Sequence, residues 1–276
     1  MAATGTELLS AIENDDNDEV TRLLTEDDAD PNYAVDDETP VIFYAVRNGN
    51  VDIVQTLHER GADLDTFDGA TAKSLLTVAI ESEGPLVLEY LLSNGLDPNM
   101  STDVSDPPLF LAVEAEPTRA LELTNTLILH GAKVNEQFDK EYNTVLHRCA
   151  HLAEPAPLVE LLLANGADAR LTNGAGDNVP MYFYKNGQSD DLIVRLYRAQ
   201  GREWMNEYTL ERRTFLHLVI TSGPIFAMPG NTLQENLNWL METDDPRPEV
   251  RLAYFMMMRR KILTAPRRSR LAEDED

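Results

Sequence analysis

The segment Gly95-Leu96-Asp97-Pro98-Asn99 recurs along the chain at a nearly constant spacing. The related segments are Asp28-Ala29-Asp30-Pro31-Asn32, Gly61-Ala62-Asp63-Leu64-Asp65, Gly131-Ala132-Lys133-Val134-Asn135 and Gly166-Ala167-Asp168-Ala169-Arg170, with Gly201 where the next copy should begin. The gaps between their first residues are 33, 34, 36, 35 and 35. A fixed period in this range is typical of a solenoid, in which similar helical units stack on one another. The question of function therefore concerns a surface and its partner more than a reaction.

An amphipathic stretch precedes these segments. In residues 51–57, 86–92 and 158–163 the apolar residues recur at i, i+3 and i+4, which places them on one face of a helix. The glycine that follows suits a left-handed helix end, where a Cβ atom is disfavoured. A shorter helix is predicted to begin earlier in each repeat, because Thr, Ser and Pro suit the start of a helix. These starts are Thr39-Pro40, Ser74-Leu75-Leu76, Pro107-Pro108-Leu109, Thr144-Val145-Leu146-His147, Val179-Pro180-Met181 and Thr214-Phe215-Leu216-His217.

The run from Thr144 to Ala150, Thr-Val-Leu-His-Arg-Cys-Ala, resembles the first-helix signature of ankyrin repeats, Thr-Pro-Leu-His-x-Ala. The Gly-Ala-Asp segments at Gly61 and Gly166 resemble the turn that closes such a repeat. The resemblance covers about residues 6–245. It implies an all-α ankyrin-repeat solenoid of six to seven helix-turn-helix repeats with β-turn fingers. The sequence departs from the pattern at an inserted loop, residues 114–117, and after His217.

The ends of the chain are predicted to lie outside the repeats. Residues 1–5 are expected to be disordered, and residues 246–263 to form a C-terminal helix that caps the last repeat. Residues 264–276 form a charged tail that is also expected to be disordered. The alternatives for this end are a partner-binding or membrane-surface helix, and a nuclear-import signal within residues 259–270.

The chain is strongly acidic, and its charge is unevenly placed. The formal net charge is −25, from 48 acidic and 23 basic side chains. Residues 246–271 carry eight basic groups and one acidic group, so the residues before 246 hold 43 acidic and 15 basic groups, a net charge of −28. Such a body repels nucleic acid and attracts basic proteins, so we expect no direct nucleic-acid binding. The alternative is that the charge serves solubility alone.

Composition also bears on where the protein works. The sequence has no run of about 18 apolar residues, so no membrane span is expected. The first residues lack the basic and apolar regions of a signal peptide, and the single Cys149 cannot form an internal disulfide. These features favour a reducing intracellular compartment, either the cytoplasm or the nucleus.

The fingers are predicted near residues 33–38, 66–69, 100–106, 137–142 and 171–177. Several combine an aromatic side chain with carboxylates, a pairing that suits a basic and partly apolar partner. The candidate partner-binding residues are Tyr33, Asp36, Asp37, Glu38, Phe67, Asp68, Phe138 and Asp139. The alternative is that each aromatic folds back onto its own finger.

The sequence Tyr182-Phe183-Tyr184 is a second candidate patch, with Tyr182 and Tyr184 as its binding residues. Neighbours on a helix lie about 100° apart, so the three rings cannot all face the core. At least one is expected to reach the surface. The alternative is that one fills a gap left by the irregular seventh repeat.

The residues His147, Cys149 and His151 resemble a metal-ligand set only at first sight. On a helix Cys149 would lie about 200° from His147, so the three would not converge on one ion. Cys149 is better interpreted as a small core residue than as a nucleophile. The sequence shows no phosphate-binding glycine-rich loop and no isolated carboxylate pair in an apolar setting. We therefore predict no catalytic, cofactor-binding or metal-binding residues.

The family resemblance implies a non-catalytic protein–protein interaction module. It would scaffold, sequester or inhibit a basic protein partner through its acidic concave face, and would be a monomer outside that complex. One alternative is a nuclear regulator resembling the ankyrin-type inhibitors of Rel-type transcription factors. Another is a repeat-only effector, immunity protein or enzyme accessory subunit.

Overall fold

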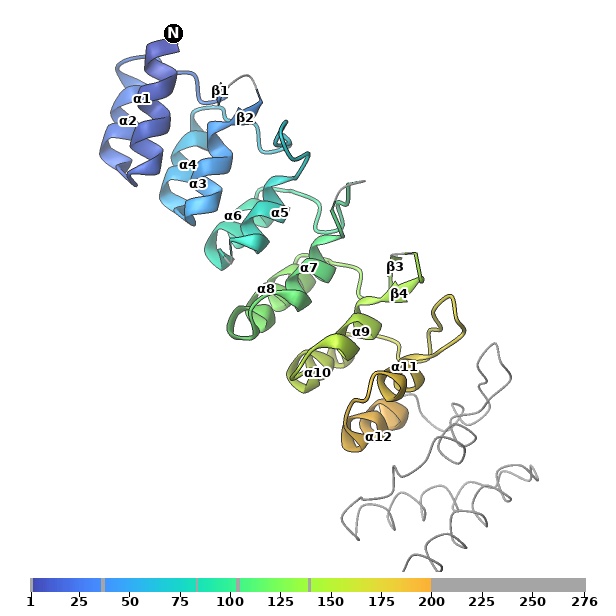
Figure 1. Ribbon diagram of the computed structural model, residues 1–276. Helices are drawn as coiled ribbons and strands as arrows, with labels where there is room; N and C mark the ends of the chain where they lie inside the picture. Colours follow the sequence, from blue (N-terminus) through green and yellow to red (C-terminus); the bar gives the residue numbers. More distant parts are fainter. Residues whose placement is uncertain (1, 36–37, 83, 103–104, 139, 200–276) are drawn as a thin grey trace, which may run out of the picture. The chain divides into compact units, whose positions relative to one another are not determined.

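The computed structural model describes residues 2–35, 38–82, 84–102, 105–138 and 140–199 (Figure 1). These residues are mostly helical, with short hairpins between the helical pairs. The helices are α1 (Ala2–Glu13), α2 (Asn17–Thr25), α3 (Val41–Asn48), α4 (Val51–Glu59), α5 (Leu75–Glu81), α6 (Pro85–Ser93), α7 (Pro108–Glu114), α8 (Pro117–Leu129), α9 (Val145–Arg148), the 3-10 turn η1 (Cys149–His151), α10 (Ala156–Ala164), α11 (Val179–Lys185) and α12 (Asp190–Ala199).

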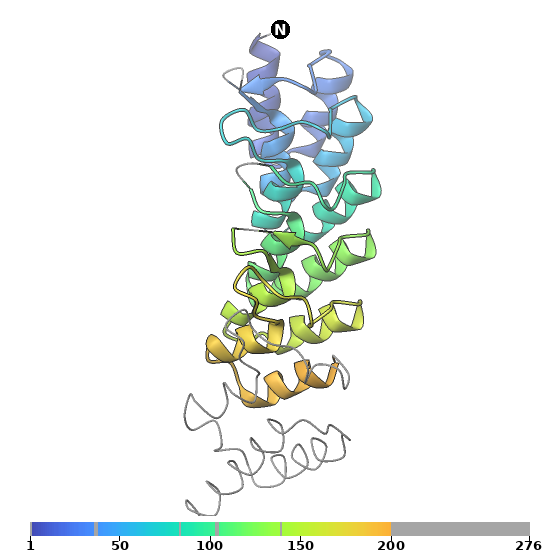
Figure 2. The same cartoon turned by 90° about the vertical axis from the view of Figure 1, so that its right-hand side faces the viewer.

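The chain divides into a first unit, residues 1–174, and a second unit that starts at residue 175. In the first unit, α1, α3, α5, α7 and α9 contact one another in order and form a column of inner helices. The outer helices α2, α4, α6, α8 and α10 form a second column beside it, which Figure 2 shows from the side. In the second unit α11 packs against α12. This stacking confirms the predicted helical solenoid.

Helix α4 shows how local sequence determines where a helix begins, which face it buries and where it ends. Its N-cap Asn50 accepts a hydrogen bond from the Ile53 amide at 3.1 Å, which satisfies a free donor of the first turn. Ile53, Val54 and Leu57 are fully buried, as their i, i+3 and i+4 spacing predicts. The helix ends before Gly61, whose φ of 97° is left-handed. The glycines that open the later turns have the same conformation: Gly95, Gly131 and Gly166.

Asparagine side chains join successive turns in the first unit. Asn32 donates to the carbonyl of Gly61 at 2.9 Å and accepts from the amide of Asp63 at 2.8 Å. The same two bonds recur from Asn99 to Gly131 and Lys133, and from Asn135 to Gly166 and Asp168. Each bridge satisfies one backbone donor and one acceptor of the next repeat. The period of the sequence therefore corresponds to a physical link between neighbouring repeats.

The fingers lie between the helical pairs, close to the predicted positions. Strands β1 (Ala34–Val35) and β2 (Thr39–Pro40) pair antiparallel, as do β3 (Gln137–Phe138) and β4 (Asn143–Thr144). Single bridges between Phe67 and Ser74 and between Thr102 and Ser105 form the second and third fingers.

The structure differs from the sequence-based expectations at two places. Helix α1 already begins at Ala2, so residues 2–5 are helical where disorder was predicted. The extra residues of the fourth copy are not an inserted loop, because α8 begins at Pro117 and reaches 13 residues, against 9 in α4 and α6. The seventh repeat, the C-terminal helix and the charged tail lie outside the described residues.

Candidate protein-binding face

The fingers and the exposed positions of the inner helices form what we call the finger face. Asp68 was predicted to contribute to its acidic surface, and the structure corrects this prediction. Asp68 is only 2% exposed. Its Oδ1 accepts from the Thr39 hydroxyl at 2.6 Å and from the Ala70 amide at 3.1 Å, and its Oδ2 accepts from the Thr71 hydroxyl at 2.6 Å. Asp68 is therefore a structural residue that joins the first two fingers.

The protonation of Asp68 follows from these contacts. Burial by itself raises the pKa of the carboxyl group, because it penalises the charged form. The hydrogen bonds from Thr39, Thr71 and the Ala70 amide outweigh this effect, so the pKa lies below its ordinary value. Asp68 is consequently a buried carboxylate that is stabilised by hydrogen bonds rather than a free surface charge.

A backbone hydrogen bond beside Asp68 completes a latch between the first two fingers. The Gly69 amide donates to the Glu38 carbonyl at 3.0 Å, and a Cβ atom on Gly69 would lie 2.6 Å from that oxygen. A second latch joins the last two fingers of the first unit. There the Gly174 amide donates to the Glu141 carbonyl at 2.7 Å, and the Asn173 side chain donates to that of Asn143 at 3.1 Å. These bonds hold the fingers side by side.

Two of the predicted aromatic anchors fold back onto the protein. Tyr33 packs on Gly5 of α1, where a Cβ atom would lie 2.5 Å from the ring. Phe138 packs on Phe110 of α7, with ring centroids 5.8 Å apart. Phe67, in contrast, is 44% exposed. Phe67 therefore remains a candidate contact at the surface, whereas Tyr33 and Phe138 pack against their own repeats' neighbours. Of the predicted acids, Glu38 is exposed, whereas Asp36, Asp37 and Asp139 lie outside the described residues.

The three consecutive aromatics of α11 divide as the helical geometry requires. Phe183 is fully buried, whereas Tyr182 and Tyr184 are partly exposed. Both tyrosines thus remain candidate contacts in the second unit.

The charges along α3, α5, α7 and α9 of the finger face are balanced rather than acidic. Lys73 contacts Glu81 at 2.7 Å. Arg148 contacts Asp106 at 2.7 Å and Glu114 at 2.6 Å. Arg47 lies over the ring of Tyr44 at 5.4 Å from its centroid. Lys73 and Arg148 are thus paired with three acids, and with Arg47 the charges of these residues sum to zero. The negative charge of the finger face therefore comes from the fingers, at Glu38, Asp65, Glu136 and Glu141, which are all exposed.

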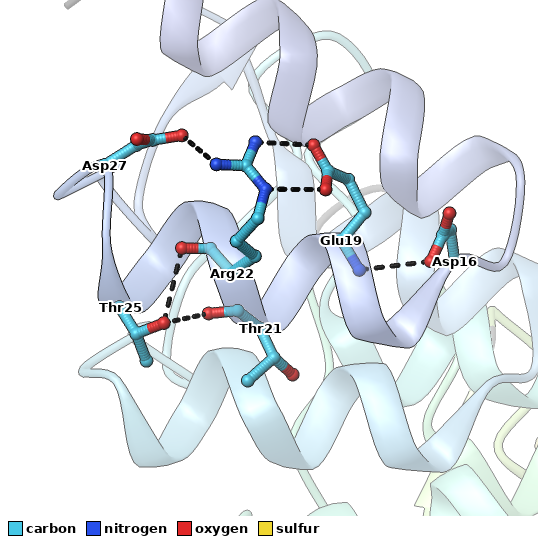
Figure 3. Close-up of polar contacts among 6 residues, drawn as sticks. All are labelled: Asp16, Glu19, Thr21, Arg22, Thr25 and Asp27. Carbon is cyan, nitrogen blue, oxygen red and sulfur yellow. Dashed lines mark hydrogen bonds and ion pairs between the residues drawn. The ribbon is translucent and has the colours of Figure 1, made fainter.

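The excess of acid is concentrated in residues 1–199. These residues hold 36 acidic and 12 basic side chains, a net charge of −24. At the N-terminal end, residues 2–33 hold ten acids and one base, Arg22. Figure 3 shows that Arg22 is held by both oxygens of Glu19, at 2.6 and 2.7 Å, and by Asp27 at 2.7 Å. The hydrogen bond from Arg22 lowers the pKa of Glu19. The N-terminal hairpin therefore presents a nearly uncompensated negative surface.

Tyr142 is an exposed aromatic residue that was not among the candidate residues predicted from the sequence. Its side chain is 62% exposed at the end of the fourth finger, and its φ of 55° is left-handed. A sequence signal does exist: Tyr142 stands two residues before the N-cap Thr144, where the following finger has Gly176 before Asn178. Because this position favours glycine, a tyrosine there is unusual and could have been noticed in the sequence.

The histidines and the cysteine of the fourth repeat have structural surroundings. His147 is fully buried, and its Nδ1 pairs with the Thr144 hydroxyl at 2.9 Å in a capping box. Cys149 is fully buried, and this burial raises the pKa of Cys149 to about 12, whereas His151 is exposed. Among the residues that the structure describes, no group of His, Cys, Asp and Glu side chains could hold a metal ion. Within the same residues, no helix is both long and apolar enough to span a bilayer.

Stacked helical pairs with latched fingers define the chain as a helical-repeat protein of the kind that binds other proteins. The family model described as ankyrin repeats (3 copies) matches residues 8–102. Residues 8–102 are therefore ankyrin repeats, and the helical pairs that follow in the described residues continue the same fold.

The curated relatives are much longer than the region they share with this chain. Alpha-latroinsectotoxin-Lt1a from Latrodectus tredecimguttatus is 28% identical over 156 residues, which are 56% of this chain and 10% of the toxin. The putative ankyrin repeat protein FPV014 of Fowlpox virus (strain NVSL) is 29% identical over 131 residues, 47% of this chain and 29% of the viral protein. The likeness therefore concerns the repeats and not the whole of either protein.

Solved structures share the fold. The ankyrin repeat domain of Bcl-3, a member of the IkappaB protein family, aligns with a TM-score of 0.62 at 18% identity, covering 77% of this chain and 92% of that domain. A chain of the complex between the Bdellovibrio bacteriovorus endopeptidase Bd0816 and immunity protein Bd3460 aligns with a TM-score of 0.57 at 20% identity, covering 68% and 97%. These likenesses show the fold alone.

Proposed function

We propose that this chain is a non-catalytic module, monomeric outside its complex, that binds a basic protein through the acidic fingers of its finger face. The observation that carries the proposal is the pairing of charges along the inner helices. Because Lys73 and Arg148 are already engaged by acids of the array, they do not offset the carboxylates of the fingers. Glu38, Glu136 and Glu141 are exposed there. A basic partner would therefore meet a negative surface that also presents Phe67, 44% exposed.

The net charge supports the attraction of a basic protein to this surface. A charge of −24 over residues 1–199 repels nucleic acid and steers basic proteins toward the surface, most strongly at low salt. The sequence predicts an acidic concave face, whereas the proposal restricts the acidic surface to the fingers. The charges along the inner helices α3, α5, α7 and α9 sum to zero, so recognition by charge is assigned to the fingers.

The test compares two variants with the same change in charge. In the finger variant, Glu38, Glu136 and Glu141 are each replaced by lysine. In the control variant, the exposed acids Glu26, Glu59 and Glu122 of the outer-helix side are each replaced by lysine. Both full-length variants are used for affinity capture from source lysate at low and moderate salt, with identification by mass spectrometry and circular dichroism to confirm folding.

The expected result is a basic protein that the wild type and the control variant capture at low salt and that the finger variant loses. Equal loss in both variants would show that only net charge matters and would refute the assignment to the fingers. Capture of partners that are not basic, unchanged in either variant, would refute the electrostatic mechanism as a whole.

A further inference from the structure

Tyr142 combines backbone strain with an exposed side chain. Left-handed backbone is disfavoured for a residue with a Cβ atom, and a bulky residue there is an outlier. The corresponding position, two residues before the N-cap, is Ala72 in the second finger, with φ 55°, and Gly176 in the last, with φ 79°. Glycine would adopt this backbone without strain. The tyrosine side chain is 62% exposed, so its packing offsets little of this cost.

The surroundings of Tyr142 hold its backbone in place and leave its ring exposed. The Tyr142 carbonyl accepts a hydrogen bond from the Gln137 side chain at 2.9 Å, and the same side chain also donates to the Thr172 carbonyl at 2.7 Å. A Cβ atom on Gly174 would lie 3.4 Å from the ring, so this glycine leaves room for the tyrosine. The finger-to-finger latch thus fixes the backbone that carries Tyr142. Within the described residues, the phenol makes no hydrogen bond.

The charges beside Tyr142 define the chemistry of a partner. Glu136 and Glu141 are exposed on the same finger, together with one base, Lys140. Arg170, two residues before Thr172, is already held by both oxygens of Asp168, at 2.8 to 3.3 Å. A cation that approaches Tyr142 therefore meets an aromatic ring next to Glu141 in sequence, whose carboxylate also accepts a hydrogen bond from the Asn143 side chain at 3.2 Å. A guanidinium group suits such a place better than an ammonium group, because it stacks on a ring while its N–H groups bind carboxylates.

We infer that Tyr142 is an anchor for an arginine side chain of the basic protein partner, with Glu141 as the adjacent residue in sequence and Glu136 as a further exposed carboxylate of the same finger. Residues with strained backbone cluster at functional sites of proteins, where the surrounding structure holds them in place. This inference rests on the proposed function and adds the kind of residue that the finger recognises. The inference also predicts that replacing Tyr142 by glycine raises the stability of the protein and weakens binding of the arginine.

The test uses the full-length chain and three synthetic peptides of one sequence that contain arginine, lysine or citrulline at the same positions. Peptide affinity is measured by fluorescence anisotropy at low and moderate salt, and the melting temperature by calorimetry. The variants are Tyr142→Gly, which removes ring and strain, and Tyr142→Phe, which keeps the ring. Ala72→Gly is the matched control, because it removes the same strain from a finger without an aromatic there.

We expect the wild type to bind the arginine peptide about fivefold more tightly than the lysine peptide, the scale of an exposed cation–π contact. Tyr142→Phe keeps this preference, and Tyr142→Gly loses it while its melting temperature rises by about 2–4 °C. Ala72→Gly melts higher with unchanged binding. A Tyr142→Gly variant that keeps the preference, or that melts below the wild type, would overturn the inference.

The outcomes separate the inference from the function on which it rests. If the wild type binds the arginine and lysine peptides equally, and the finger variant loses both, binding by the acidic fingers is supported. The role of Tyr142 as an arginine anchor is then refuted. If the wild type binds neither peptide at low salt, both the proposed function and the inference are refuted.

Discussion

Replacement of Asp68 should reveal how much stability the first two fingers draw from one buried carboxylate. Its hydrogen bonds with Thr39, Thr71 and the Ala70 amide are charge-assisted, and a hydrogen bond to a charged group contributes about 1.5–3 kcal/mol. Thr71 and Ala70 are exposed and can bind water instead, but Thr39 is only 9% exposed. We therefore expect Asp68→Ala to lower the free energy of unfolding by about 3 kcal/mol and Asp68→Asn by about 1–2 kcal/mol.

The effect should depend on pH in a defined direction. The pKa of Asp68 is lower in the folded protein than in the unfolded chain, so its contribution is complete at neutral pH. It is lost as the pH falls below about 4, the ordinary range of an aspartate, and through the folded pKa. The difference in stability between the wild type and Asp68→Asn should therefore shrink on acidification.

The assay is urea unfolding of the full-length chain at pH 7 and at pH 3.5, together with hydrogen exchange of the Gly69 and Ala70 amides. Asp65→Asn is the control, because Asp65 is an exposed acid of the same repeat and its replacement should cost less than about 0.5 kcal/mol. If Asp68→Asn behaves like Asp65→Asn at both pH values, the reasoning about the latch is wrong.

Three further predictions concern the rest of the first unit. Asn135→Ala removes the bridge to Gly166 and Asp168 and should cost about 1 kcal/mol in urea unfolding, with faster hydrogen exchange of the Asp168 amide; an unchanged exchange rate would contradict it. Thr124→Val should raise the unfolding free energy by about 1 kcal/mol, because the buried Thr124 hydroxyl has no hydrogen-bond partner among the residues that the structure describes; a loss of stability would contradict this. The Cys149 thiol should react with a maleimide at pH 7.5 only in denaturant, and rapid native labelling would reopen a nucleophilic role.

Local features of the sequence predicted the repeat architecture. The glycines of the turns, the N-caps and the i, i+3, i+4 spacing act within a few residues, so each repeat carries its own signals. They placed α4, α6 and α10 and the fingers near their observed positions. The start of α1 and the length of α8 were predicted wrongly, because helix ends depend on packing as well as on local signals.

The candidate site was predicted less well than the fold. Glu38 and Phe67 are exposed as expected, whereas Asp68 is buried, and Phe138 packs on Phe110. These outcomes depend on a side chain meeting the neighbouring repeat, about 30 residues away in sequence. Composition gave the sign of the surface charge, but it could not show which charges neutralise one another.

The sequence by itself determined the repeat period, the glycine turns that close the repeats and the acidic character of this protein, because these depend on covalent order and on contacts within one repeat. The tertiary structure alone decided that Asp68 is a buried latch, that Arg148 binds two acids of the preceding repeat and that Tyr142 is an exposed, strained residue. Burial and ion pairing arise where repeats stack, and the stacking brings together groups that no local pattern connects.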